Sequence, residues 1–151
     1  MFHFNKAAVS DIYNFLAICD QAFIPALSSQ VNIRRYSEKL YENAETVEFW
    51  TNGRLSGLVA FYCNDHERKT AYVTSVGVLP EFQGIGIAKE MLKKTIEIAI
   101  EENMEFMRLE VGRQNERAAN MYRRLNFRVL SESTHTLLME KKIGDEKGAE
   151  E

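Results

Sequence analysis

A loop with two closely spaced glycines joins an apolar segment to an amphipathic one, and this loop could hold a phosphate group. The apolar segment ends near Pro80, which cannot donate a hydrogen bond within a sheet, and the loop follows as Gln-Gly-Ile-Gly-Ile-Ala at residues 83–88. From Ala88 onward apolar residues recur at helical spacing. Uncovered N–H groups at the positive end of a helix dipole favour a phosphate or a pyrophosphate.

The spacing of the glycines excludes two known phosphate loops. The dinucleotide fingerprint requires a third glycine where this chain has Lys89, and the Walker loop requires Gly-Lys-Ser/Thr after four intervening residues. A Gly-x-Gly pair can also serve only to make a tight turn. The loop alone therefore indicates an anion site without identifying the ligand.

Two motifs resemble those of the GNAT superfamily of N-acetyltransferases. The first, Gln/Arg-x-x-Gly-x-Gly/Ala after a strand ending in Val-x-Pro, is filled by Gln83, Gly86 and Ala88 behind Val78 and Pro80. The second, a pattern of the ribosomal-protein alanine acetyltransferases, is filled by Leu109, Glu110, Val111, Asn115, Tyr122 and Phe127. Asn126 stands where that pattern has glycine, and asparagine is the next-best residue for a left-handed helix C-cap. The resemblance extends in weaker form over residues 1–141.

The resemblance implies acetyl-CoA as co-substrate. In GNAT enzymes two adjacent parallel strands splay apart, and the pantetheine arm lies between them; here these strands would be residues 70–78 and 106–111. The pyrophosphate would lie on the amides of residues 84–88. The cofactor-binding residues expected on this basis are Val76, Val78, Gln83, Gly84, Ile85, Gly86, Ile87, Ala88 and Asn115.

Glu110 and Tyr122 are the candidate catalytic residues for transfer of the acetyl group to an amine. An alkylamine has a pKa near 10 and an α-amine one of about 8, so the acceptor arrives mostly protonated and needs a base. The resemblance implies that Glu110 is this base, directly or through water. Tyr122 lies about two helical turns after Asn115 and could protonate the leaving thiolate. A backbone N–H around residues 76–78 would meet the oxyanion.

Each of these residues also has a purely structural interpretation. Glu110 could face solvent or pair with Arg108 or Arg113, and Tyr122 could pack beneath its own helix. Asn115 is expected to cap that helix, which is compatible with a cofactor contact.

The predicted function is that of an N-acetyltransferase in which a primary amine attacks acetyl-CoA directly, in a ternary complex. The acceptor could be a small-molecule amine, an amino sugar or a peptide or protein amine, and the length of the acyl group is equally open. A non-catalytic acyl-CoA-binding sensor is the alternative, which loss of Glu110 or Tyr122 would favour, but both are present. GNAT proteins are frequently dimers, so a homodimer is left open.

Hydrophobic periodicity predicts an α/β fold, with a central mixed, largely antiparallel sheet flanked by helices, similar to the GNAT fold. The predicted strands are residues 2–4, 47–50, 55–63, 70–78, 106–111, 127–130 and 136–141. Three of the predicted helices have an N-cap, at Ser10, Asn32 and Asn115, and the remaining one begins at Ala88. Asn52-Gly53 predicts a hairpin turn, and Gly57 a close approach or a bulge. The strand, helix and strand around the glycine loop predict parallel neighbours.

The bulk properties favour one domain over residues 1–141, followed by a charged, mobile tail over residues 142–151. A net charge of −3 argues against a nucleic-acid partner. Without an apolar segment of roughly 20 residues or a signal peptide, a cytoplasmic protein that does not enter a membrane is expected. Cys19 and Cys63 form no metal-ligand motif, which indicates buried free thiols and no metal site.

The segment between the first two predicted helices is the candidate for acceptor recognition. Residues 23–41 combine aromatic and apolar side chains with charged ones, including Tyr36 and Tyr41. The alternative is that both tyrosines only pack the second helix against the sheet. The loop at residues 131–135 is the other candidate.

Overall fold

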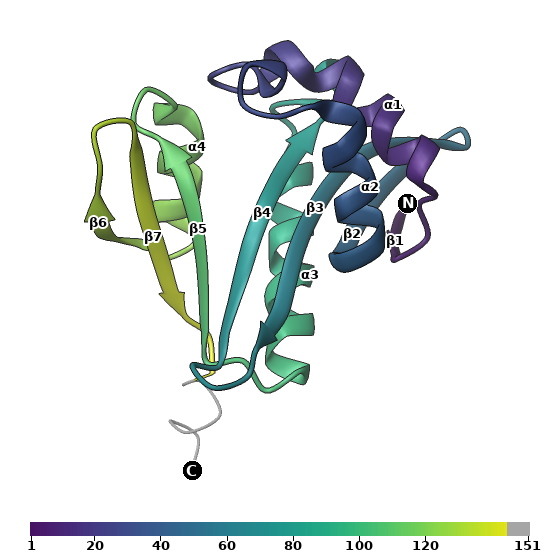
Figure 1. The fold of residues 1–151 in the computed structure, drawn as a ribbon. Helices are drawn as coiled ribbons and strands as arrows, with labels where there is room; N and C mark the ends of the chain where they lie inside the picture. The colour runs from purple at the N-terminus through teal and green to yellow at the C-terminus, as the bar shows by residue number, and fades with distance from the viewer. Residues whose placement is uncertain (145–151) are drawn as a thin grey trace. The chain divides into compact units, whose positions relative to one another are not determined.

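A computed structural model describes residues 1–144, and its helices and strands follow one another in the predicted order (Figure 1). The strands are β1 (Phe2–Phe4), β2 (Glu45–Thr51), β3 (Arg54–Asp65), β4 (Thr70–Val78), β5 (Phe106–Gly112), β6 (Arg128–Glu132) and β7 (Thr136–Lys142). The helices are α1 (Val9–Cys19), α2 (Ile33–Asn43), α3 (Ile87–Glu101) and α4 (Glu116–Arg124), with the short 3-10 turns η1 (Asp20–Ala22), η2 (Leu27–Ser29) and η3 (Pro80–Phe82). The predicted α/β class is confirmed.

The strands form a mixed sheet in the order β1-β2-β3-β4-β5-β7-β6. Strands β4 and β5 are parallel neighbours, as predicted, and β1-β2, β2-β3, β5-β7 and β6-β7 pair antiparallel. The register of β4 with β5 runs from Thr70↔Phe106 to Val73↔Leu109. The last five residues of β4, Thr74 to Val78, therefore extend past the end of this pairing.

The chain divides into two compact units, of which the first contains residues 1–61 and 75–95. Within it, α1 and α2 lie on one face of the strands and α3 lies on the other (Figure 1). A Cβ at Gly57 would lie 3.0 Å from the Cε of Met91 in α3, and the β2–β3 register shifts between Phe49 and Trp50. The close approach and the bulge that Gly57 predicts are both present.

The second unit contains residues 62–74 and, within the described chain, 96–144. Helix α4 packs on β5 and ends in a Schellman motif, in which Phe127 N–H donates to Tyr122 O (3.0 Å) and Asn126 N–H donates to Arg123 O (2.9 Å). Asn126 has a φ of 70°, so it adopts the left-handed conformation that the resemblance predicts for this position.

The first helix starts earlier than predicted. Its N-cap is Ala8 and not Ser10, and the Ala8 N–H donates to the Asp11 carboxylate at 2.9 Å. The Asp11 side chain therefore satisfies the cap amide from inside the first turn, which removes the need for a serine at the cap.

The loop at residues 24–30 also contains more structure than expected, since Leu27 in η2 is buried.

The predicted tail begins too early. Lys142 belongs to β7, and Ile143 is 1% exposed and donates its N–H to Glu105 O at 2.8 Å. Burial of this one apolar side chain orders the chain beyond the last predicted strand. The rest of the predicted tail, residues 145–151, lies outside the described residues, and the single domain over residues 1–141 stays a prediction.

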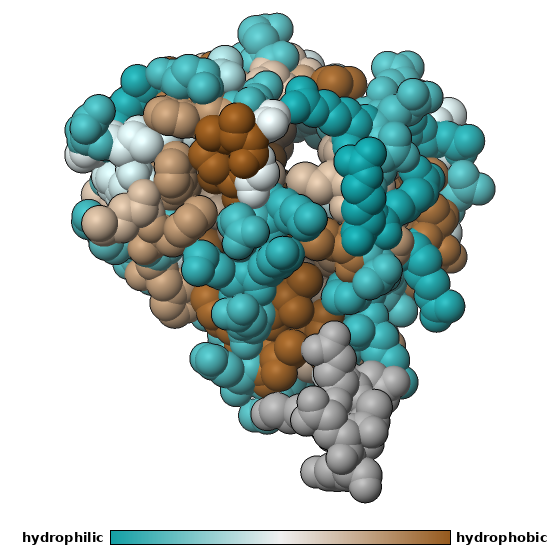
Figure 2. Space-filling view, turned by 180° about the vertical axis from the view of Figure 1, so that it is seen from behind, coloured by the Kyte–Doolittle hydropathy of each residue, from teal (hydrophilic) through white to brown (hydrophobic). Residues whose placement is uncertain are grey.

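Helix α3 is amphipathic as predicted. Met91, Leu92 and Ala99 are fully buried, whereas charged residues such as Lys89, Glu90 and Lys93 are exposed. Seen from behind, the surface mixes hydrophilic side chains with hydrophobic ones (Figure 2). No helix within residues 1–144 combines the length and the apolar character that a membrane crossing requires.

Candidate active site

The glycine loop in the first unit is shaped by two left-handed glycines. Gly84 has a φ of 80° and Gly86 a φ of 89°, a region that residues with a side chain adopt only at a cost. Before them, the Gln83 side-chain amide donates to Val78 O at 3.1 Å, which ties the loop to the end of β4. Helix α3 begins directly after Gly86, one residue earlier than predicted.

The backbone donors of this loop are available to a ligand. Glu90 N–H donates to Gly86 O at 3.1 Å and closes the first turn of α3, but the N–H groups of residues 84–88 donate to no acceptor among the described residues. The loop is also open, because Ile85 is 70% exposed and a Cβ at Gly86 would meet no atom within 4 Å. Free N–H groups at a helix N-terminus are able to bind an anion.

Glu110 lies in the second unit, on the exposed side of β5. Its Oε1 accepts a hydrogen bond from the Tyr72 hydroxyl of β4 at 3.2 Å. The parallel register places Tyr72 beside Arg108, so Glu110 is the next residue on the same face of β5. Sequence reasoning missed Tyr72, because only the register of the two strands shows which tyrosine reaches this carboxylate.

Neither arginine named in the structural interpretation of Glu110 pairs with it among the described residues. The Arg108 Nε lies 2.7 Å from the Glu140 carboxylate, whose side chain is only 10% exposed. The Arg113 guanidinium lies 3.8 Å from Glu132 and donates to Ser133 O at 3.0 Å. The Glu110 carboxylate is thus held by a neutral phenol and keeps a face open to solvent, as a base that receives a proton requires.

Tyr122 lies on α4 with its ring packed edge to face against Phe127, at a centroid distance of 5.9 Å. The residue is only 6% exposed, and burial raises the pKa of its hydroxyl to about 12. No described hydrogen bond uses this hydroxyl, and no fully buried side-chain oxygen within residues 1–144 lacks a partner, so the hydroxyl oxygen keeps some exposure to solvent. The packing role is therefore present, and the hydroxyl remains available as a donor.

Asn115 is the N-cap of α4, as predicted, and its Oδ1 accepts a hydrogen bond from Ala118 N–H at 3.2 Å. Its side-chain NH₂ makes no described hydrogen bond. A cofactor contact through that NH₂ would leave the cap intact, so the two predicted roles of Asn115 remain compatible.

The segment after α1 is closed on itself by Asp20, whose carboxylate accepts hydrogen bonds from the Ser28 N–H (2.6 Å) and hydroxyl (2.7 Å). These bonds lower the pKa of Asp20. Tyr36 packs against the core of the first unit, as the structural alternative predicts, but Tyr41 is 54% exposed and does not.

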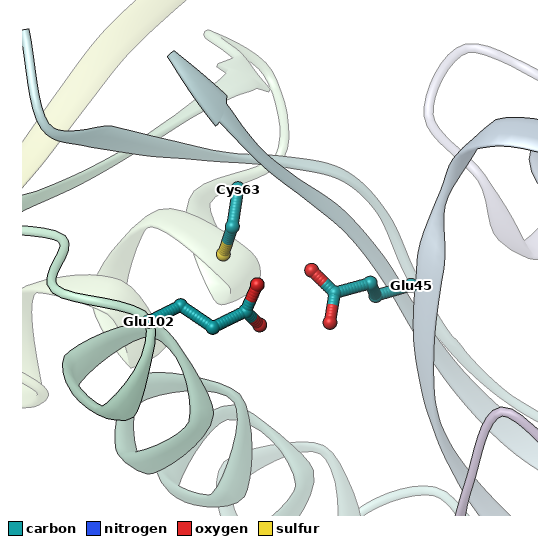
Figure 3. A group of neighbouring side chains, drawn as sticks. All are labelled: Glu45, Cys63 and Glu102. Atoms are coloured by element: carbon teal, nitrogen blue, oxygen red, sulfur yellow. The ribbon is translucent and has the colours of Figure 1, made fainter. Parts of the chain in front are cut away.

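Neither cysteine forms a disulfide and both are buried, as predicted. In the second unit the Cys63 thiol and the Glu102 carboxylate lie within 4.8 Å of one another (Figure 3). Glu45, also labelled there, lies on β2 and belongs to the first unit. One thiol and one carboxylate fall short of the ligand set of a structural zinc site.

Comparisons with known proteins agree with the resemblance. The chain is 35% identical over 80 residues to an uncharacterised N-acetyltransferase of Methanocaldococcus jannaschii, which is 50% of this chain and 35% of that protein. It is 31% identical over 77 residues to the thialysine N-epsilon-acetyltransferase of Mus musculus, 51% of this chain and 45% of that protein. The matches thus span less than half the length of these relatives.

A similar fold is found in the PaiA N-acetyltransferase of Thermoplasma acidophilum, which was solved in complex with coenzyme A. The TM-score is 0.76 at 18% identity, over 94% of this chain and 99% of that chain. The sequence model of the acetyltransferase (GNAT) family matches residues 10–127, which includes both motifs. The chain therefore belongs to the acetyltransferase (GNAT) family.

Proposed function

We propose that the protein transfers the acetyl group of acetyl-CoA to a primary amine, by direct attack in a ternary complex. The observation that carries this proposal is the loop at residues 84–88, where left-handed glycines and backbone N–H groups without a partner precede α3. Such a site suits the pyrophosphate of coenzyme A. Membership of the GNAT family supports acetyl-CoA as the co-substrate. Two cysteines that form no disulfide fit a reducing compartment such as the cytoplasm.

The cofactor would be held along β4 and at the start of α3. The pantetheine arm would pair with the backbone of Val76 and Val78, in the part of β4 that extends past its pairing with β5. Gln83 would keep the loop in place through its hydrogen bond to Val78 O. Asn115 would contribute its free amide NH₂.

Glu110 would take a proton from the acceptor ammonium, directly or through a water. The neutral amine nitrogen then forms a bond to the thioester carbonyl carbon, and the oxyanion is met by a backbone N–H around residues 76–78. As the C–S bond breaks, the sulfur takes the electron pair and the Tyr122 proton, while the nitrogen loses its second proton, which restores the Tyr122 hydroxyl directly or through water. The products are the acetylated amine and coenzyme A, and the proton on Glu110 passes to solvent.

A thiol-release assay tests this function. Acetyl-CoA is offered with a panel of amines that spans peptides, amino sugars, polyamines and amino acids with a side-chain amine, the last because a relative is named for thialysine. At least one amine is expected to give release of the coenzyme A thiol and a product with one added acetyl group. Binding of acetyl-CoA without turnover on any amine would favour the sensor function instead.

Glu110→Gln is expected to lower kcat/KM at pH 7 by about tenfold or more, because a general base contributes at least this factor. The loss should shrink as the pH rises toward the pKa of the acceptor, where more of the amine is already neutral. The measurement is the pH profile of kcat/KM for the best amine in the panel.

Two further variants make this test specific. Glu97→Gln, on the exposed side of α3, is the control for removal of a surface carboxylate and should leave the profile unchanged. Tyr72→Phe removes the 3.2 Å hydrogen bond but keeps the base, so it should reduce activity less than Glu110→Gln. If Glu110→Gln has the same pH profile as the wild type, Glu110 is a surface carboxylate without a role in catalysis.

Substitutions in the loop at residues 24–30 are expected to change the KM for the amine by more than fivefold and to leave the KM for acetyl-CoA nearly constant. Ile24→Ser suits the experiment because Ile24 is 49% exposed, whereas Leu27 is buried and its loss would disturb the fold. Val9→Ser, at a residue that is 37% exposed, is the matched control. Equal effects on both substrates, or none on either, would move acceptor recognition to residues 131–135.

A further inference from the structure

A pocket in the first unit uses none of the residues assigned to catalysis or to acetyl-CoA. It lies between α1 and the start of β3 and has a volume of about 430 Å³. Its walls include Asp11, Asn14, Phe15, Ile18, Arg54 and Leu55. Ligand sites in proteins typically occupy roughly 300–1,000 Å³, so the pocket is large enough for a small metabolite.

Part of the lining of this pocket is apolar. Phe15 and Leu55 are core residues, at 1% and 3% exposure, and Ile18 is 51% exposed. Asp11, Phe15 and Ile18 recur at the i, i+4 and i+7 positions of α1, so they share one face of the helix. That face carries the Asp11 carboxylate at its N-terminal end, and Asn14, at the i+3 position, also lines the pocket.

The polar groups that line the pocket have bonding capacity that the described residues do not use. Within residues 1–144 the Arg54 guanidinium pairs only with Glu81, at 3.8 Å, which is too far for a hydrogen bond, so its N–H donors make no hydrogen bond to these residues. The Oδ2 atom of Asp11 accepts a hydrogen bond from Ala8 N–H, whereas Oδ1 has no donor within residues 1–144. The Asn14 amide makes no hydrogen bond within residues 1–144.

These groups define a ligand with two opposite charges and an apolar body. A guanidinium binds a carboxylate through paired N–H donors, and the carboxylate of Asp11 suits an ammonium group. A purely apolar ligand would displace the water that hydrates Arg54 and Asp11 and would offer no hydrogen bonds in its place, which costs free energy. A ligand with several phosphates would find only one cation in the wall. We propose that this pocket binds a free amino acid with an apolar side chain.

The test uses L-leucine as the probe and the ¹⁵N-labelled full chain without acetyl-CoA, so its outcome does not depend on the proposed enzyme activity. Leucine is expected to shift the amide signals of Phe15, Ile18 and Leu55 saturably, with a dissociation constant of about 1 mM. Isoamylamine, which lacks the carboxylate, and 4-methylpentanoate, which lacks the amine, are expected to bind at least about tenfold more weakly.

Three variants locate the site. Arg54→Ala and Asp11→Asn should each raise the dissociation constant for leucine about tenfold, and Asn at position 11 still provides an acceptor for the Ala8 N–H. Arg35→Ala, at an exposed arginine of α2, is the matched control and should bind as the wild type does. The proposal is overturned if leucine gives no saturable shifts, if the shifts lie elsewhere, or if Arg54→Ala binds leucine unchanged.

Discussion

Gly86→Val is expected to abolish the thermal stabilisation that acetyl-CoA gives the protein. A ligand that binds only the native state adds about 2.7 kcal/mol at 100 times its dissociation constant, which corresponds to a rise of about 5 to 10 °C in Tm for a chain of this size. A side chain at Gly86 would project into the open space in front of the free N–H groups, where no atom of the chain lies within 4 Å. The φ of 89° would also strain any β-branched residue and pull the loop out of shape.

Backbone strain alone could lower Tm, so the experiment needs a variant with similar strain at a position outside the proposed phosphate site. Gly53 provides it, because it has a φ of 74°, and a Cβ there would also meet nothing within 4 Å. Both valine variants should lose comparable stability without ligand, whereas only Gly86→Val should lose the response to acetyl-CoA in thermal-shift measurements. A wild-type response in Gly86→Val would disprove the assignment of residues 84–88 as the phosphate site.

The features that the sequence predicted are those set by residues near one another in the chain. Gly84 and Gly86 signal a left-handed turn because other residues rarely adopt it, and the structure gives both a positive φ. Asn126 was predicted as a left-handed cap for the same reason, and its φ is 70°. Asn115 was predicted as an N-cap from its side chain and its place before a helical pattern, and it caps α4.

The features that the sequence could not give depend on contacts between distant residues. The hydrogen bond from Tyr72 to Glu110 joins residues 38 positions apart and requires the register of β4 with β5. Glu48 is another case, because a strand carboxylate would ordinarily face solvent, yet it is fully buried. Its carboxylate accepts hydrogen bonds from Lys6 N–H, Ala7 N–H and the Trp50 indole N–H. Only the folded chain brings these donors to the carboxylate, and they are what allows it to be buried.

Tyr122→Phe is expected to lower kcat by roughly 10²–10³, within the usual range for loss of a general acid. The ring contact with Phe127 is kept by phenylalanine, so Tm and acetyl-CoA binding should stay close to those of the wild type. Tyr13→Phe, which removes the hydroxyl of a tyrosine on α1 but keeps the ring beneath the Arg34 guanidinium, is the matched control and should retain full activity.

The raised pKa of Tyr122 leads to a second, independent prediction about this residue. A group that acts by donating a proton or hydrogen bond is active while protonated and loses this function as the pH rises through its pKa. With a pKa of about 12, the hydroxyl stays protonated throughout the range in which the acceptor amine titrates. The wild-type kcat profile should therefore show no decline due to Tyr122 up to about pH 10, and the ratio of wild-type to Tyr122→Phe kcat should be constant with pH. If phenylalanine at this position leaves kcat within about twofold of the wild type, Tyr122 is only a packing residue, and the leaving thiolate is stabilised by other donors or by solvent.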